Sequence, residues 1–77
     1  MSITSNLAEG FSRKGSKEKR QFYAVALGSL TELQNQLLVA HDVGYLKVDA
    51  FSRVAEMTVE VSKLINGLIK YVGNRAS

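Results

Sequence analysis

Five basic residues lie close together near the start of the chain, and phosphate binding is the chemistry that such a group could perform. The segment from Phe11 to Arg20 carries five cations and one carboxylate, a local balance of +4 in a chain of net charge +3. The cations are Arg13, Lys14, Lys17, Lys19 and Arg20. Because lysine and arginine neutralise phosphates, the segment is a candidate contact for RNA or DNA. The alternative is a solvated turn that only keeps the protein soluble.

The same stretch has a superficial likeness to a nucleotide-binding loop. Residues 10–17 read GFSRKGSK, whereas a phosphate-binding loop reads G-x-x-x-x-G-K-[ST] and follows a strand. Here the serine precedes the lysine, and no strand is expected before the first glycine. A turn between two helices is the better interpretation, so nucleotide binding is not predicted.

Other residues with catalytic or metal-binding chemistry are few. His41 is the single histidine and the chain has no cysteine, so neither a zinc cluster nor a histidine-activated nucleophile is predicted. Glu9 and Glu32 could form a carboxylate pair, but a di-metal bundle also needs Glu-x-x-His repeats, which the sequence lacks. We therefore expect no enzymatic activity, no cofactor and no metal. His41 is predicted to complement the dipole at the end of a helix.

Polar residues near the expected helix contacts favour a structural role instead. Ser29, Glu32 and Gln36 are spaced by three and four residues, so they share one face of a helix. Buried polar groups must be paired, which predicts a hydrogen-bonded polar layer that fixes the register of the helices. Its candidate members are Asn6, Glu9, Ser29, Glu32 and Gln36.

The elements that carry these residues are predicted to be two long helices. Apolar residues recur at alternating steps of three and four from Lys17 to Asp42 and again from Val48 onward, which is typical of helices packed against helices. The first seam contains Tyr23, Ala26, Leu30, Leu33, Leu37 and Ala40; the second contains Phe51, Val54, Thr58, Val61, Ile65, Leu68 and Val72. A further row seven residues apart, Met57, Leu64 and Tyr71, widens the second seam.

Capping signals predict where these helices begin and end. Ser16 is a plausible N-cap for the first helix, and Gly44 is expected to end it. Gly73 and Asn74 are expected to end the second helix. Gly67 lies inside that helix, where glycine costs about 1 kcal/mol relative to alanine, and it is expected to mark the close approach of another backbone.

The fold class that follows is all-α. Ile3, Leu7 and Phe11, at spacing four, predict a short amphipathic helix before the hairpin of long antiparallel helices. This set corresponds to the last two and a half helices of a four-helix bundle, with residues 1–77 forming a single partial domain. A chain this small rarely gains more than roughly 3–5 kcal/mol from its own core, so we expect a homo-oligomer. No apolar run approaches the ~20 residues that cross a bilayer, and we expect a cytoplasmic protein.

Two blocks of the sequence resemble the bacterial four-helix bundle family first described as encoded in 23S rRNA intervening sequences. That family reads roughly S-I-P-S-N-I-A-E-G-F-G-R, then F…A-L-G-S-L-x-E-L-x-T-Q-L, then G-Y-L. The residues that match are Ser2, Ile3, Ser5, Asn6, Ala8, Glu9, Gly10, Phe11 and Arg13, then Phe22, Ala26, Leu27, Gly28, Ser29, Leu30, Glu32, Leu33, Gln36 and Leu37, then Gly44, Tyr45 and Leu46. Thr4 stands where the family usually has proline.

The resemblance implies further properties. Family members, among them the accessory variability proteins of retroelements, form homopentameric barrels whose basic surface is implicated in binding nucleic acid, without an established enzymatic activity. They carry a long first helix and half of a second before the matched block. The resemblance therefore implies that this chain is truncated at its N-terminus, or that its start is assigned too late.

Two functional hypotheses follow from these observations. The first is an oligomeric scaffold that binds nucleic acid, RNA more than DNA, through the basic segment. The second is an interaction module whose uncovered apolar groove binds a helix of a partner protein. A gene fragment without a stable function is a third possibility.

Overall fold

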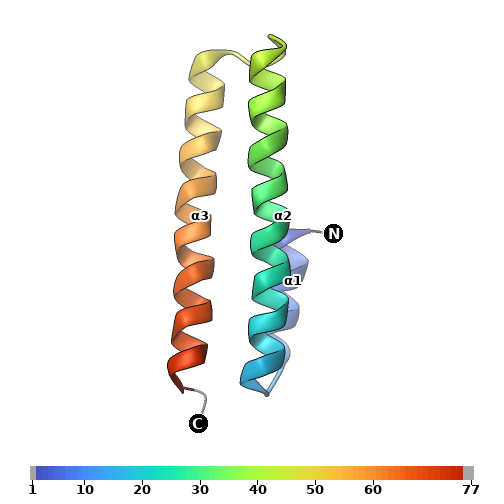
Figure 1. Ribbon diagram of the computed structural model, residues 1–77, viewed down its shortest axis with the longest axis vertical. Helices are drawn as coiled ribbons and strands as arrows, with labels where there is room; N and C mark the ends of the chain where they lie inside the picture. Colours follow the sequence, from blue (N-terminus) through green and yellow to red (C-terminus); the bar gives the residue numbers. More distant parts are fainter. Residues whose placement is uncertain (1, 76–77) are drawn as a thin grey trace.

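The computed structural model describes residues 2–75, which form three helices. Helix α1 spans Ile3–Ser12, α2 spans Ser16–Asp42 and α3 spans Val48–Arg75. The two long helices lie side by side as an antiparallel hairpin, and α1 lies against the N-terminal half of α2 (Figure 1). These residues contain no strand, and none of their helices is long and apolar enough to cross a membrane. The predicted all-α fold, a long-helix hairpin with a short N-terminal helix, is confirmed.

The first turns of α1 and α2 are capped differently. The Oγ of Ser2 accepts a hydrogen bond from the backbone N–H of Ser5 at 2.9 Å, which satisfies one free donor at the start of α1. For α2 the predicted cap, Ser16, is wrong by one residue, because Gly15 is the N-cap and makes no side-chain hydrogen bond. Gly15 is extended, with φ −82° and ψ 138°, so Ser16 already belongs to the helix.

Gly44 ends α2 as predicted, in a left-handed conformation with φ +84°. Its N–H donates to the carbonyl of His41 at 3.1 Å, and the N–H of Tyr45 donates to the carbonyl of Ala40 at 2.9 Å. These two bonds form a Schellman motif, which satisfies carbonyls at the end of the helix. The chain then reverses direction over a few residues and enters α3 at Val48.

Replacing Gly44 by alanine is expected to lower the free energy of unfolding by about 1–2 kcal/mol, because a Cβ is strained in the left-handed region. Urea unfolding followed by circular dichroism, at one fixed protein concentration, measures the effect. Gly44→Asn is the matched control, since asparagine tolerates this conformation better. Equal stability of the alanine variant and the wild type would contradict the Schellman ending.

The predicted end of α3 at Gly73 and Asn74 is wrong, because the helix continues to Arg75. Glycine stops a helix when it adopts positive φ, and among residues 2–75 only Gly44 does so. Gly67 also differs from its expected role: a Cβ built there meets nothing within 4 Å. Within the described part of this single chain, no other backbone approaches Gly67.

The core is confined to the half of the molecule where three helices meet. Tyr23, Ala26 and Leu30 of α2 are buried against Ile65 and Val72 of α3, and side chains of α1 pack on this cluster. Toward the Gly44 turn, the seam residue Leu33 remains 36% exposed. Because α1 is short, it covers only part of α2. The seam residues of α2 beyond α1 pack against α3 alone.

Gly10 allows α1 to approach α2 closely. A Cβ on Gly10 would lie 2.4 Å from Cε1 of Tyr23, a distance that no side chain could keep. Tyr23 is 1% exposed, and the Phe11 ring meets its ring edge-on with centroids 5.8 Å apart. Burial raises the pKa of the Tyr23 phenol. The glycine and the tyrosine therefore fix the position of the short helix.

Candidate nucleic-acid interface

The basic segment, residues 11–20, forms the turn between α1 and α2 and the first turn of α2, at the opposite end of the molecule from Gly44 (Figure 1). Its five cations lie together at this end, because the turn between α1 and α2 is only three residues long. We call this surface the basic turn. Its cations do not all have the same surroundings, and the difference decides which of them are available to a phosphate.

Arg13 is bound to acidic side chains of the protein itself. Its Nη2 donates to Oε2 of Glu9 at 3.1 Å, and its Nη1 lies 3.8 Å from Oε2 of Glu18. The guanidinium also stacks over the ring of Phe22, 5.1 Å from its centroid. Because its side chain is 43% exposed, these ion pairs are partly screened by solvent. They still orient Arg13 and partly neutralise its charge.

Lys19 has a structural role that the sequence did not indicate. Its Nζ donates to the backbone carbonyls of Gly10 at 3.1 Å and Phe11 at 3.0 Å. These carbonyls belong to the last turn of α1, where carbonyls lack the usual helical partners and a cation is favoured. The Gly10 carbonyl also accepts a hydrogen bond from the N–H of Arg13 at 3.3 Å. Lys19 therefore caps α1 from the neighbouring helix.

Replacing Lys19 by methionine is expected to lower the free energy of unfolding by about 1–2 kcal/mol, since charge-assisted hydrogen bonds to two carbonyls are lost. Lys17→Met is the matched control, because Lys17 is exposed on the same helix and its change should stay within about 0.5 kcal/mol. Both values come from urea unfolding at one protein concentration. Two variants of equal stability would show that the cap contributes nothing.

Lys14, Lys17 and Arg20 are exposed, like Arg13, but differ from it in their partners. Within residues 2–75 the ion pairs involve Arg13 and His41, so these three have no acidic partner among the described residues. Arg20 extends toward the end of α3, where its Nη1 lies 4.0 Å from the position that a Cβ would take on Gly73. Three cations are thus held on rigid helical backbone or beside it, open to a ligand.

The five candidate members of the polar layer do not come together in the single chain. Asn6 is buried and its Nδ2 donates to the carbonyl of Ser2 at 2.9 Å, while Glu9 pairs with Arg13. Ser29 is half-buried, and Glu32 and Gln36 are exposed. A shared layer of these residues therefore stays a prediction.

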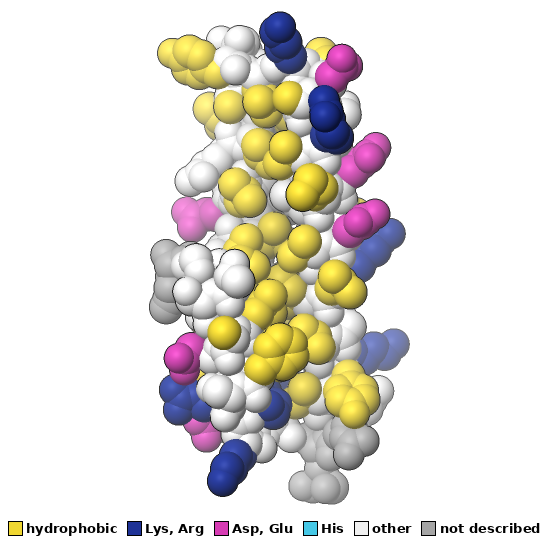
Figure 2. Space-filling view, turned by 180° about the vertical axis from the view of Figure 1, so that it is seen from behind, with side chains coloured by type: hydrophobic (Ala, Val, Ile, Leu, Met, Phe, Trp, Pro, Cys, Tyr) yellow, Lys and Arg dark blue, Asp and Glu magenta, His cyan; other side chains and the backbone are white. Residues whose placement is uncertain are grey.

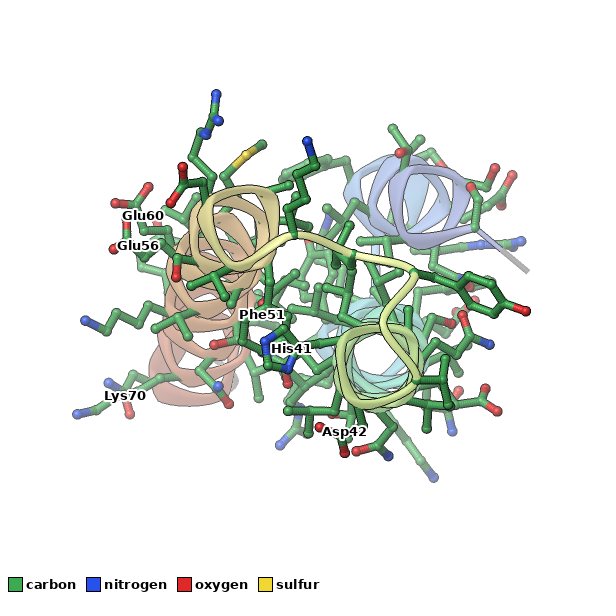
Figure 3. All side chains as sticks on the ribbon, turned by 90° about the horizontal axis from the view of Figure 1, so that it is seen from above. His41, Asp42, Phe51, Glu56, Glu60 and Lys70 are labelled. Carbon is green, nitrogen blue, oxygen red and sulfur yellow. The ribbon has the colours of Figure 1, made fainter. Side chains whose placement is uncertain are left out.

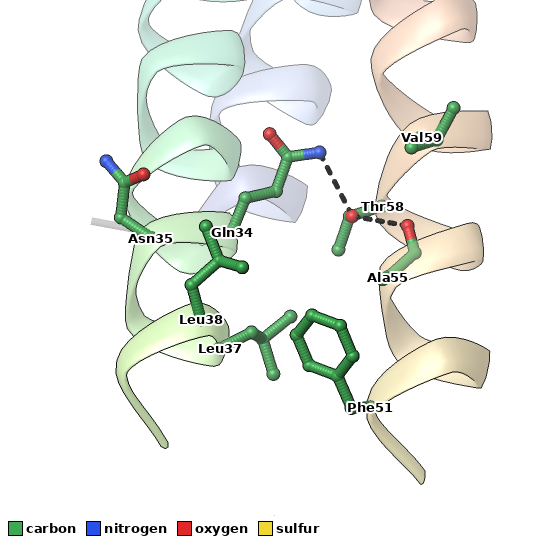
Figure 4. A pocket seen from close by; sticks show the side chains of 8 residues that line it. All are labelled: Gln34, Asn35, Leu37, Leu38, Phe51, Ala55, Thr58 and Val59. Atoms are coloured by element: carbon green, nitrogen blue, oxygen red, sulfur yellow. Dashed lines mark hydrogen bonds between the residues drawn. The ribbon is translucent and has the colours of Figure 1, made fainter. Parts of the chain in front are cut away.

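A different polar pair lies between the long helices. Nε2 of Gln34 donates to Oγ1 of Thr58 at 3.0 Å, and the Thr58 hydroxyl donates to the carbonyl of Ala55 at 2.7 Å (Figure 4). The sequence placed Thr58 in the second seam but missed Gln34. The spacing could have indicated Gln34, because it follows Leu30 by four residues and Leu27 by seven and so lies on the same face of the helix.

A comparison with known protein families shows to which family the chain belongs. The family model described as 23S rRNA-intervening sequence protein matches residues 1–67. The chain belongs to this family. Searches of curated proteins and of solved structures gave no match.

As a 23S rRNA-intervening sequence protein, the chain carries the family pattern across most of its structure. The matched residues include α1, the basic turn, α2 and α3 as far as Gly67. The resemblance seen in two sequence blocks is thereby confirmed and extended into the last helix, which the sequence placed by its periodicity alone. Both Gly10, which admits Tyr23, and Gly44, which ends α2, lie within the matched region.

His41 of this family member lies at the Gly44 end of the hairpin. Its ring stacks on Phe51 with centroids 4.5 Å apart, and its Nδ1 lies 3.6 Å from Oδ1 of Asp42 (Figure 3). Glu56 and Glu60 point outward from α3, away from His41 (Figure 3). Among residues 2–75 there is no group of three acidic, histidine or cysteine side chains that could hold a metal ion. The aromatic stacking gives His41 a packing role between the helices.

Proposed function

We propose that this 23S rRNA-intervening sequence protein is a non-enzymatic, oligomeric helical scaffold that binds nucleic acid in the cytoplasm, with RNA as the expected ligand. The observation that carries the proposal is the exposure of Lys14, Lys17 and Arg20 at one end of the helix pair. Cations at the start of a helix oppose its dipole, at a cost of about 0.3–1 kcal/mol each. A phosphate there offsets that cost, because the free N–H groups of the first turn also attract anions.

Assembly would strengthen such binding. Three cations of one chain contact few phosphates, and binding through them alone should be weak at physiological salt. Several copies in one particle present the same basic turn repeatedly along one RNA, so each contact after the first is intramolecular. Homo-oligomers are also expected for a chain with so small a core.

Filter binding of labelled RNA and DNA, titrated across salt concentrations, tests the proposal. We expect retention at low salt, a linear fall of the logarithm of the association constant with the logarithm of salt, and little preference for base sequence. RNA and DNA are compared in single-stranded and duplex form to identify the ligand. Absence of retention of either nucleic acid at low salt would reject the proposed function.

A second candidate function is a protein-interaction adaptor, and one observation favours it. Leu7 and Phe11 of α1 and Leu64 and Leu68 of α3 line an open apolar groove. Such a groove can accept an amphipathic helix of another protein. Co-purification of a defined protein at fixed stoichiometry after nuclease treatment would support the adaptor, whereas loss of all partners with nuclease would favour the nucleic-acid scaffold.

A further inference from the structure

The end of α3 lies beside the basic turn, and the two segments line one pocket. Because the long helices are antiparallel, the last turns of α3 lie at the same end of the molecule as the turn between α1 and α2 (Figure 1). At this end, the lower one in Figure 2, basic side chains lie next to hydrophobic ones. The pocket has a volume of about 210 Å³ and is lined by Lys14, Ser16, Lys19, Tyr71 and Val72. We call it the Tyr71 pocket.

Tyr71 brings an aromatic ring to the cations, and this residue is 58% exposed. No aromatic residue lies between Arg13 and Arg20 along the chain, so the sequence alone does not indicate a surface on which bases could stack. Leu64, seven residues before Tyr71, lines an apolar groove without charged side chains, whereas two lysines line the Tyr71 pocket. Proteins that bind single-stranded nucleic acid combine an exposed aromatic ring with cations in this way.

The lysines of the Tyr71 pocket supply its positive charge. Nζ of Lys19 donates to the carbonyls of Gly10 and Phe11, and these two bonds leave one of the three N–H donors of an ammonium group. A cation that the fold already holds in place loses little conformational entropy when it binds a phosphate. Lys14 is exposed and adds a second charge. Val72 belongs to the buried core cluster and forms a rigid part of the lining.

We propose that Tyr71 stacks on an unpaired base of RNA whose phosphate is bound by Lys14 and Lys19, so that the basic turn prefers single strands to duplexes. This inference rests on the proposed function and specifies the form of its ligand. The Tyr71 pocket is smaller than the roughly 300–1,000 Å³ that enclose a whole small ligand, so it holds the phosphate while the base lies on the ring at its edge. The internal bases of a duplex are paired and stacked on each other, and they do not reach Tyr71.

Stacking would strengthen binding that charge alone leaves weak. The cations of one copy contact few phosphates, and the affinity that they supply falls steeply with salt. A base on an aromatic ring adds affinity, and it does so for any sequence because every base has a π-face. A preference for single strands therefore agrees with the weak preference for base sequence expected of this protein.

Filter binding of three ligands to the wild type and to Tyr71→Leu tests the inference. The ligands are a single-stranded RNA, a long duplex of RNA with its complement, and an abasic strand that has only sugars and phosphates. Leucine is apolar and favours helix but has no ring. Tyr71→Leu should bind the single strand about 10-fold more weakly than the wild type does. It should bind the duplex and the abasic strand as the wild type does, because the phosphate contacts are unchanged.

Two control variants separate the aromatic ring from other effects. Tyr71→Phe keeps the ring, so its affinity for the single strand should stay within about 2-fold of the wild type. Tyr45→Leu makes the same change at the opposite end of the molecule, where Tyr45 is 87% exposed. This variant should bind all three ligands as the wild type does. Circular dichroism should show the same helix content for every variant.

Several outcomes would overturn the inference. Equal affinity of Tyr71→Leu and the wild type for the single strand would show that no base stacks on Tyr71. An equal loss of affinity for all three ligands would give Tyr71 a structural role in shaping the basic turn. If Tyr71→Phe binds the single strand as weakly as Tyr71→Leu does, the hydroxyl group rather than the ring contacts the nucleic acid.

The same measurements separate this inference from the proposed function. A wild type that retains none of the ligands at low salt would reject the nucleic-acid function and, with it, the stacking on Tyr71. A wild type that retains RNA, together with a Tyr71→Leu variant of equal affinity, would reject the stacking and leave the proposed function standing.

Discussion

Replacing Gly10 by alanine should lower the free energy of unfolding by about 1–3 kcal/mol, as overpacking of a core does. The added methyl would lie 2.4 Å from Cε1 and 2.8 Å from Cδ1 of Tyr23. Tyr23 is 1% exposed and belongs to the best-buried cluster of the chain, so its ring has no free space to enter. Helix α1 must therefore shift away from α2. Against a total of roughly 3–5 kcal/mol for a chain of this size, the loss is large.

Gly28→Ala is the matched control for Gly10→Ala. Gly28 lies in α2 with nothing within 4 Å of a built Cβ, so alanine should raise the stability by about 0.5–1 kcal/mol through its helix propensity. Opposite signs for the two variants, measured by urea unfolding at one protein concentration, would locate the effect in the contact between Gly10 and Tyr23. A Gly10→Ala variant as stable as Gly28→Ala would show that α1 does not pack on Tyr23 in solution.

The sequence predicted the three helices because their apolar spacing is long and regular. It predicted less well which seam residues would be buried. Tyr23 and Leu30 are buried, whereas Leu33 in the same seam is 36% exposed. The spacing shows which face of a helix is apolar, and only the three-dimensional arrangement shows how far a neighbour covers it. Here the short helix α1 covers the part of α2 that contains Tyr23 and Leu30 and ends before it reaches Leu33.

The ends of the helices show a second limit of sequence reasoning. Gly44 and Gly73 carry the same signal, yet the first adopts positive φ and ends α2, while α3 continues past the second. The Schellman hydrogen bonds at Gly44 form because the chain must turn back there to pack α3 on α2. At Gly73 the backbone does not adopt positive φ, and α3 continues to Arg75.

The basic turn could be identified from composition alone, but the roles of its members could not. Lys19 caps α1 only because the turn between α1 and α2 brings its Nζ to the carbonyl of Gly10. Arg13 meets Glu9 one helical turn earlier and Glu18 across the turn. These contacts separate Arg13 and Lys19, which bind other groups of the fold, from the three cations without an acidic partner among the described residues. The nucleic-acid hypothesis is therefore testable residue by residue.

Replacing Lys14, Lys17 and Arg20 together by serine should weaken RNA binding on the order of 100-fold at low salt, while the helix content is unchanged. Each of these cations is exposed and is assigned one phosphate contact per copy. Removing such a contact lowers the slope of log affinity against log salt by about 1. The triple variant should therefore lose about 2–3 units of slope per bound copy. Filter binding at several salt concentrations measures both quantities.

The matched control removes the same charge from elsewhere on the surface. Lys47, Arg53 and Lys63 are exposed and lie outside the basic turn, so their replacement by serine changes the net charge equally. If the basic turn holds the nucleic acid, this variant should keep most of the affinity and most of the salt slope. If both triple variants lose affinity alike, binding depends only on net charge, and the assignment of Lys14, Lys17 and Arg20 as the contact surface is wrong.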